Sequence, residues 1–162
     1  MVELSMAVAH RMGLSEEEVA DIEQAALLHD VGKIGVPDSI LHKPGPLGES
    51  EKELMHEHPI IGERIVASIE GLAHLAPVIR AEHERWDGKG YPDGLSGEHI
   101  PLASRVVFTC DSFHAMTSDR PYRDAMGVRA ALEELERSSG KQFDPSTVRA
   151  LLDVVGDARA DT

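Results

Sequence analysis

The sequence is poor in cysteine and in aromatic residues. Cys110 is the only cysteine of 162 residues, which excludes an internal disulfide framework and is typical of a reducing compartment. Aromatic residues make up 4% of the chain, whereas hydrophobic residues as a whole make up 41%. This composition favours a helical protein over a sandwich or barrel, which needs more tyrosine, phenylalanine and threonine. A chain of this length forms one domain with a sizeable core.

Long hydrophobic runs and basic residues are also scarce. No apolar run reaches the ~18–20 residues that a membrane span needs, and the sequence has no signal segment. We therefore expect a cytoplasmic protein that does not enter a membrane by itself. Basic residues number 16 against 29 acidic ones, a net charge of −13, which excludes a protein that coats DNA or RNA polymers. A small anionic substrate stays open, because divalent cations held by acidic ligands reverse the local charge.

The hydrophobic pattern predicts an all-α fold, because no segment alternates apolar and polar residues as a strand does. The expected helices cover residues 2–12, 15–31, 49–70, 77–85, 103–118, 128–137 and 144–155. The density of glycine and proline predicts loops at 38–48 and 86–101, and we expect residues 156–162 to form a flexible tail.

Three local signals place helix boundaries. Ser15 and Glu18 form a capping-box pattern. Asp144 followed by Pro145 predicts the start of the last helix. Pro59 is expected to kink the long helix or to split it in two.

Candidate metal ligands occur at four places on the expected helices or at their ends. They are His29 with Asp30, His58, Glu82 with His83, and Asp111. The aspartates lie among apolar residues, and a charged aspartate is seldom buried unless it is paired or bound to a metal. Helical proteins build di-metal sites from such histidines and carboxylates on several helices. A mixed set of imidazole and carboxylate ligands suits iron, manganese or zinc better than calcium or magnesium.

Plainer interpretations of these residues are also open. Asp30 alone fits a helix C-terminal cap, and Asp111 alone fits a buried partner for Arg105. Most histidines on helices are surface residues, and we expect this for five of the nine in the chain, namely His10, His42, His56, His74 and His99.

Four long sequence blocks decide between these interpretations. They are HDVGKIGVPDSILHKPGPL, MHEHPIIGERIV, HERWDGKGYPDGLSGEHIPLASRV and CDSFHAMTSDRPYR. In this order they resemble the HD-GYP family of metal-dependent phosphohydrolases, and the resemblance assigns residues 1–155 to an HD-GYP domain. It implies an all-α helical bundle with a GYP loop between helices. It also implies hydrolysis of cyclic di-GMP to linear pGpG, with further cleavage to GMP as an option, by an output domain of bacterial signalling.

The resemblance also assigns a role to each matching residue. It implies two divalent metal ions, iron or manganese first, with zinc, nickel or magnesium as alternatives. The implied metal ligands are His29, Asp30, His58, Glu82, His83 and Asp111, with Asp30 bridging the two metals. Asp30 and Lys33 are the implied catalytic residues. Lys33, Tyr91, Arg120 and Arg123 are the implied substrate contacts, with Lys33 on a phosphate oxygen and Tyr91 on a guanine or the sugar-phosphate. Trp86 is expected to pack the GYP loop onto the helices.

The chain departs from the family pattern at three positions. Glu82 stands where the family has a histidine, and it can bind the same metal through oxygen. His114 stands where the family has an aspartate, and we expect it at the edge of the site or facing solvent. The first family histidine falls before Met1, and His10 lies too late in the sequence to replace it, by roughly 15–20 Å along a helix. We therefore expect a truncated N-terminal helix and a first metal with few protein ligands.

Two other functions stay open from the sequence. One is a catalytically impaired domain that binds a cyclic dinucleotide or a partner protein through the GYP loop. The other is an HD phosphohydrolase that acts on a different nucleotide. As partners we expect cyclic di-GMP and an upstream sensory or receiver domain, with a homodimer or a GGDEF-type protein as further options.

Overall fold

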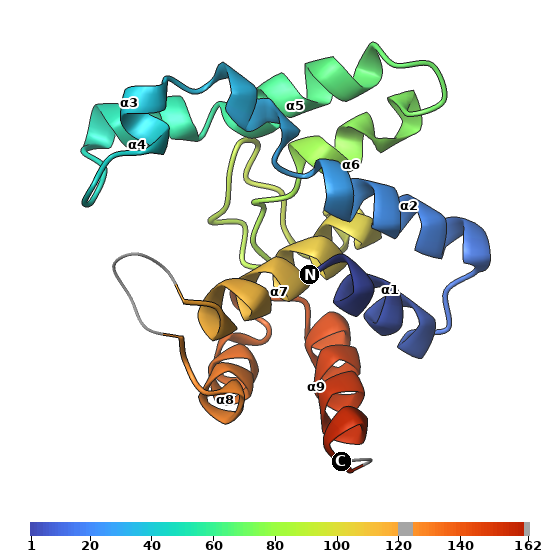
Figure 1. Cartoon of the computed structure of the whole chain (residues 1–162). Coiled ribbons are helices and arrows are strands. Elements are labelled where there is room, and N and C mark those ends of the chain that lie inside the picture. Colours follow the sequence, from blue (N-terminus) through green and yellow to red (C-terminus); the bar gives the residue numbers. More distant parts are fainter. Residues whose placement is uncertain (120–124, 161–162) are drawn as a thin grey trace.

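The computed structural model describes residues 1–119 and 125–160, and in these residues the fold is built from helices (Figure 1). The longer helices are α1 (Val2–Arg11), α2 (Glu16–Leu28), α5 (His58–Ala67), α7 (Leu102–Thr117), α8 (Val128–Ser138) and α9 (Pro145–Ala160). The shorter ones are α3 (Asp38–Leu41), α4 (Glu49–Met55), α6 (Ala76–Arg80) and the 3-10 helices η1 (Val31–Gly35), η2 (Ala73–Leu75) and η3 (Gly97–His99). No strand and no helix able to cross a membrane occurs among the described residues. The all-α prediction is confirmed.

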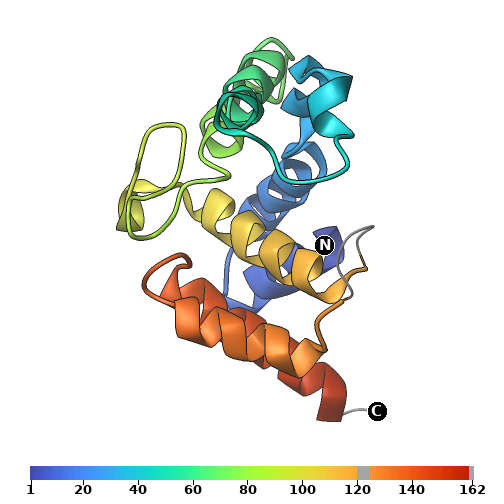
Figure 2. The same cartoon turned by 90° about the vertical axis from the view of Figure 1, so that its left-hand side faces the viewer.

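Helix α7 lies at the centre of the fold, and α1, α2, α8 and α9 pack around it (Figures 1 and 2). Helix α1 also contacts α2 and α9, which closes the bundle. The side chains between these helices form the core, with Val8, Ile22, Val106, Leu135 and Leu151 among its fully buried members. This packing holds α2 and α7 side by side.

A second group of elements consists of η1, α5 and α6, which pack on one another. Gly32 in η1 lies against the start of α5, where a Cβ atom added to it would be 1.9 Å from the carbonyl oxygen of His58. Gly62 of α5 is also close to its neighbours, since a Cβ atom there would lie 2.9 Å from Ile79 of α6. Gly32 is needed because the backbone of α5 leaves no room for a larger residue, whereas at Gly62 the nearest obstacle is the Ile79 side chain.

The predicted helix signals are confirmed. Ser15 and Glu18 form the capping box at the start of α2, each side chain accepting a hydrogen bond from the other residue's backbone N–H. The long helix predicted for 49–70 is split into α4 and α5, and Pro59 lies in the first turn of α5, where a missing N–H costs no helical hydrogen bond. Asp144 accepts a hydrogen bond from the N–H of Ser146 at the start of α9.

Three predicted boundaries are wrong. The stretch predicted as a loop at 38–48 contains α3, one helical turn that buries Ile40. The helix predicted for 77–85 ends at Arg80, because the N–H of Glu82 bonds to Ile79 three residues back and the chain then turns. Helix α9 continues past residue 155 to Ala160, so five residues expected in the tail are helical.

Arg105 on α7 pairs with Asp144 at the start of α9. The Nη1 atom of Arg105 lies 2.5 Å from Oδ2 of Asp144, and its Nε donates to the carbonyl oxygen of Ile100. Asp144 is buried. The alternative that Arg105 partners Asp111 is therefore wrong. The pair holds α9 to α7. Because it is a buried ion pair, removal of either partner would leave the other charge buried without compensation.

We expect Asp144→Asn to lower the free energy of unfolding by about 3 kcal/mol, because it keeps the acceptor for Ser146 but leaves Arg105 without its buried counter-charge. Urea denaturation measures the change. The matched control is Asp153→Asn, which removes an ion pair of 3.1 Å with Arg11 whose side chains are about half exposed, and it should cost less than about 1 kcal/mol. Equal costs for the two variants would contradict the prediction.

Candidate metal centre

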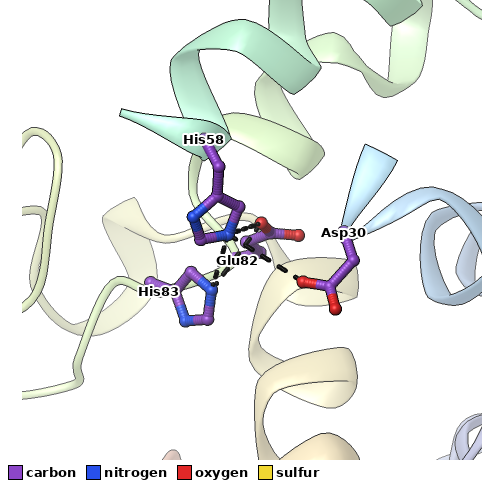
Figure 3. Close-up of side chains that lie close together, drawn as sticks. All are labelled: Asp30, His58, Glu82 and His83. Atoms are coloured by element: carbon purple, nitrogen blue, oxygen red, sulfur yellow. Dashed lines mark hydrogen bonds and ion pairs between the residues drawn. The ribbon is translucent and has the colours of Figure 1, made fainter. Parts of the chain in front are cut away.

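Four side chains from three segments of the chain meet beside the start of α5 (Figure 3). Asp30 follows α2, His58 is the first residue of α5, and Glu82 and His83 follow α6. Each offers one ligand atom, and the four atoms lie within 4.8 Å of one another. The close packing of η1 on α5 and of α5 on α6 brings these segments together.

In His58 and His29, one ring nitrogen bonds to a backbone carbonyl oxygen, and the other ring nitrogen is left free to bind a metal. The Nδ1 atom of His58 lies 2.7 Å from the carbonyl oxygen of Met55, and Nδ1 of His29 lies 2.8 Å from that of Ala26. A carbonyl oxygen only accepts, so the proton of each neutral ring is on Nδ1. Both Nε2 atoms therefore carry a lone pair, and an imidazole oriented by such a bond is typical of a metal ligand.

The bare Nε2 of His58 points into the cluster. It lies 3.1 Å from Nε2 of His83 and 3.0 Å from Oε1 of Glu82, and 3.9 Å from Oδ1 of Asp30. His58 is 1% and Glu82 is 3% exposed, and neither oxygen of Glu82 receives a hydrogen bond within the described part of the chain. Unsatisfied buried acceptors that converge on one point are costly unless a cation binds among them.

The shifted pKa values of Glu82 and His83 reflect the same cost of burying a charge. Burial raises the pKa of Glu82 to about 7, although the neighbouring His58 opposes this shift. Burial and the nearby His58 lower the pKa of His83 to about 3, so this imidazole is neutral at physiological pH. A neutral imidazole and a buried carboxylate are the forms that bind a divalent cation. The residues of the cluster therefore fit a metal ion.

Two further predicted ligands lie next to this cluster. The Nε2 atom of His29 is 3.6 Å from Oδ2 of Asp30 and 3.9 Å from Oδ1 of Asp111 on α7. Asp30 therefore has one oxygen toward His58 and the other toward His29. The structure brings together all six predicted ligands, in two halves that meet at Asp30.

Lys33 lies at the edge of the same site. Its Nζ atom donates to Oδ2 of Asp30 at 2.7 Å. Burial favours the neutral form of Asp30, but the hydrogen bond from Lys33 and the nearby His29 hold the pKa of this carboxyl below its usual value. Asp30 is therefore a carboxylate at neutral pH and available as a ligand.

Tyr91 of the GYP loop packs against a ligand of the cluster. Its ring stacks on His83 with centroids 4.9 Å apart and on His56 with centroids 3.8 Å apart. Two rings stacked on the same face of Tyr91 would also contact each other. His56 and His83 make no ring contact among the described residues, so they lie on opposite faces of Tyr91. Both faces of this ring are covered, which leaves its edge and hydroxyl for any substrate contact. His56, expected as a surface histidine, is exposed but belongs to this stack.

Two residues, Arg80 and Glu84, hold the GYP loop in place, a role that the sequence did not predict. Arg80 at the end of α6 donates two hydrogen bonds to the carboxylate of Asp93, at 2.6 and 2.8 Å, and a third to Glu63 of α5. The buried Glu84 accepts a hydrogen bond of 2.7 Å from the backbone N–H of Asp93. Because Asp93 lies two positions after Tyr91, these bonds fix Tyr91 over the cluster. Neither residue follows a spacing that sequence reasoning recognises.

The other end of the loop is attached to the turn between α8 and α9. The backbone N–H of Trp86 donates to the carbonyl oxygen of Gln142 at 3.1 Å, and the guanidinium of Arg105 lies 5.7 Å from the Trp86 ring. Trp86 thus packs the loop onto the helices, as expected.

The remaining predicted residues lie elsewhere. His114 is exposed on α7, with its Nε2 3.5 Å from the hydroxyl of Ser118, and it faces solvent as expected. His10 is exposed near Glu16. Arg120 and Arg123 lie outside the described residues.

The family follows from comparison with known proteins. The HD domain family model matches residues 1–147, and the chain belongs to this family. Its GYP loop and its relatives place it in the HD-GYP branch, as its sequence resemblance predicted. Of the solved structures, a cyclic GMP-AMP specific phosphodiesterase of Vibrio cholerae has a similar fold. It gives a TM-score of 0.77 at 22% identity, over 98% of this chain and 43% of that one.

Curated relatives are more similar in sequence. The chain is 50% identical to the cyclic di-GMP phosphodiesterase response regulator RpfG of Xanthomonas campestris over 90% of its length, and 46% identical to a cyclic di-GMP phosphodiesterase of Thermotoga maritima over 92%. It spans only 39% and 41% of these two proteins. It is also 42% identical to the 3′3′-cGAMP-specific phosphodiesterase 2 of Vibrio cholerae, over 90% of this chain and 28% of that protein.

Proposed function

We propose that the chain is a metal-dependent phosphodiesterase domain that hydrolyses cyclic di-GMP to pGpG. The observation that carries this proposal is the convergence of ligand atoms from Asp30, His58, Glu82 and His83, of which His58 and Glu82 are buried. The relatives named as cyclic di-GMP phosphodiesterases support the substrate class.

The six ligands form two halves around Asp30, and we propose that they hold two divalent cations, iron or manganese first. When bound, such cations supply an activated water near neutral pH and positive charge for the phosphoryl oxygens. Asp30 contributes a carboxylate oxygen to each half. Lys33 adds a point charge at the edge of the site, where it contacts a phosphate oxygen of the substrate. Tyr91 offers its hydroxyl, and Arg120 and Arg123 remain proposed substrate contacts.

Hydrolysis of 3′3′-cGAMP is a second candidate activity. It is favoured by the identity to a Vibrio cholerae enzyme named as specific for that substrate. Two of the residues implied as substrate contacts, Arg120 and Arg123, lie outside the described residues. The two substrates must therefore be compared directly.

The test is hydrolysis by the purified chain after anaerobic loading with Fe²⁺ or Mn²⁺, with bound metal measured by mass spectrometry. We expect about two metal ions per chain and pGpG as the product of cyclic di-GMP. A loaded chain that binds the cyclic dinucleotide without cleaving it would instead support a binding domain. Faster cleavage of 3′3′-cGAMP would support the second candidate.

The partners of the domain are also proposals. We propose an upstream sensory or receiver domain, because the chain spans about two-fifths of a relative that is named a response regulator. A homodimer and a GGDEF-type protein remain further candidates. Size-exclusion chromatography with light scattering of the full-length protein tests the homodimer.

Glu82 is the ligand whose identity differs from the family pattern. We expect Glu82→Gln to weaken metal binding by about tenfold or more, because an amide oxygen lacks the charge that the cluster supplies to a cation. Glu82→His, which keeps a ligand of the family type, should retain the metal. Competition with a coloured chelator measures the affinity. The control is Glu98→Gln, an exposed glutamate in the same loop, and equal affinities for all variants would argue against Glu82 as a ligand.

A further inference from the structure

The three-ring stack has one open end. It begins at His83 in the metal cluster, continues through Tyr91 and ends at His56, with centroid distances of 4.9 and 3.8 Å. The inner face of His56 lies nearly parallel to Tyr91, at an interplanar angle of 14°. His56 is exposed, and no hydrogen bond or ion pair of its imidazole occurs among the described residues. Its outer face is therefore a flat aromatic surface turned toward solvent.

The position of this surface is fixed by the site itself. His56 lies two residues before the ligand His58, and Tyr91 is held by the bonds of Asp93 to Arg80 and Glu84. Since Tyr91 has no free face, His56 is the member of the stack on which another ring can pack. Two stacking distances, 4.9 and 3.8 Å, separate His56 from the candidate ligand His83, so a ring on its outer face lies one step beyond the stack, at a distance that a dinucleotide with its phosphate at the cluster can span.

We propose that the outer face of His56 binds a nucleobase of the cyclic dinucleotide by stacking. The proposal rests on the proposed function, in which the adjoining phosphate lies at the metal cluster. Stacking on an aromatic side chain uses the π-face that every base has, so it is tolerant of base identity. His56 therefore contributes to affinity for cyclic di-GMP and 3′3′-cGAMP alike, and it does not discriminate between them.

The kinetic test compares His56→Ala, His56→Leu and His56→Phe in the metal-loaded chain. Stacking of one base is worth about 1–3 kcal/mol, so the alanine variant should raise KM for cyclic di-GMP by about 5- to 150-fold, with kcat within about twofold. Phenylalanine restores KM. Leucine covers Tyr91 but offers no aromatic face, and it should leave KM raised. Metal content should be unchanged in all three.

A packing role for His56 gives a different pattern. If His56 only supports Tyr91 and the ligand behind it, leucine restores the activity and alanine lowers metal content or kcat. That result overturns the proposal, as does an unchanged KM in the alanine variant.

A binding test does not depend on hydrolysis. In His56→Trp, stacking of pGpG should quench the new tryptophan, whereas ribose 5-phosphate, which has no base, should not. The wild-type protein, which keeps its single Trp86, is the control. Quenching in His56→Trp, together with a wild-type chain that hydrolyses no cyclic dinucleotide, would refute the proposed function but retain the stacking. Hydrolysis by the wild type without quenching in His56→Trp would refute the stacking alone.

Discussion

The Asp30→Ala variant is expected to lose its bound metal and to hydrolyse cyclic di-GMP at least about a thousandfold more slowly. Asp30 has Oδ1 directed at the half with His58 and Oδ2 directed at the half with His29, at 3.9 and 3.6 Å. Its removal takes a ligand from both halves and also frees Lys33, which donates to the same carboxylate. Metal sites supply several kcal/mol of transition-state stabilisation, and each 1.36 kcal/mol is worth about tenfold in rate.

The measurement has two parts, metal content by mass spectrometry and the rate of pGpG formation at saturating substrate. The control is Asp38→Ala, which removes an exposed aspartate from α3 and should leave both unchanged. Asp30→Asn keeps the shape of the side chain and should also lose most of the activity. Full metal content together with wild-type rates in Asp30→Ala would contradict the assignment of the site.

The Gly32→Ala variant is expected to show the largest loss of stability. The added Cβ atom would lie 1.9 Å from the carbonyl oxygen of His58 and 2.5 Å from the backbone nitrogen of Gly62. These are backbone atoms of α5, which cannot rotate away as a side chain can, so η1 must separate from α5. We expect a loss of more than about 4 kcal/mol in the free energy of unfolding, or no folded protein. Any folded fraction should also lose metal, because η1 positions Asp30 against His58.

Thermal and urea denaturation of the metal-free protein measure this effect. Gly156→Ala is the matched control, since nothing lies within 4 Å of an added Cβ atom and the residue is in α9. That change should stabilise the protein by roughly 0.4–1 kcal/mol. A Gly32→Ala variant as stable as the wild type would show that the two backbones are farther apart than described here.

The sequence predicted the cluster of candidate ligands better than the contacts that support it. The six candidate ligands were predicted from motifs that resemble the family, and their side chains lie close to one another. The contacts of Arg80 and Glu84 with Asp93 could not be predicted, because the path of the GYP loop is what brings Asp93 to them. No periodic pattern in the sequence predicts the path of the GYP loop.

The errors in the fold have a similar origin. One interpretation left open by the sequence paired Asp111 with Arg105 of the same helix. The actual partner, Asp144, is 39 residues away and is brought close by the packing of α9 on α7. The early end of α6 at Arg80 was also unpredictable from propensity, because it is the position of Glu82 and His83 against His58 that requires the chain to turn.

Because the candidate ligands lie far apart in the sequence, binding of a cation is coupled to folding of the domain. The six ligands come from four segments between His29 and Asp111, and they converge only when α2, α5, α6 and α7 have packed. An unfolded chain disperses them, so a cation that binds the centre binds the native state alone. By mass action, each tenfold increase of free cation above its dissociation constant then adds about 1.4 kcal/mol to the stability of the whole domain. If the centre binds a cation as proposed, the stability of the domain will therefore rise with the concentration of free metal, whether or not a substrate is present.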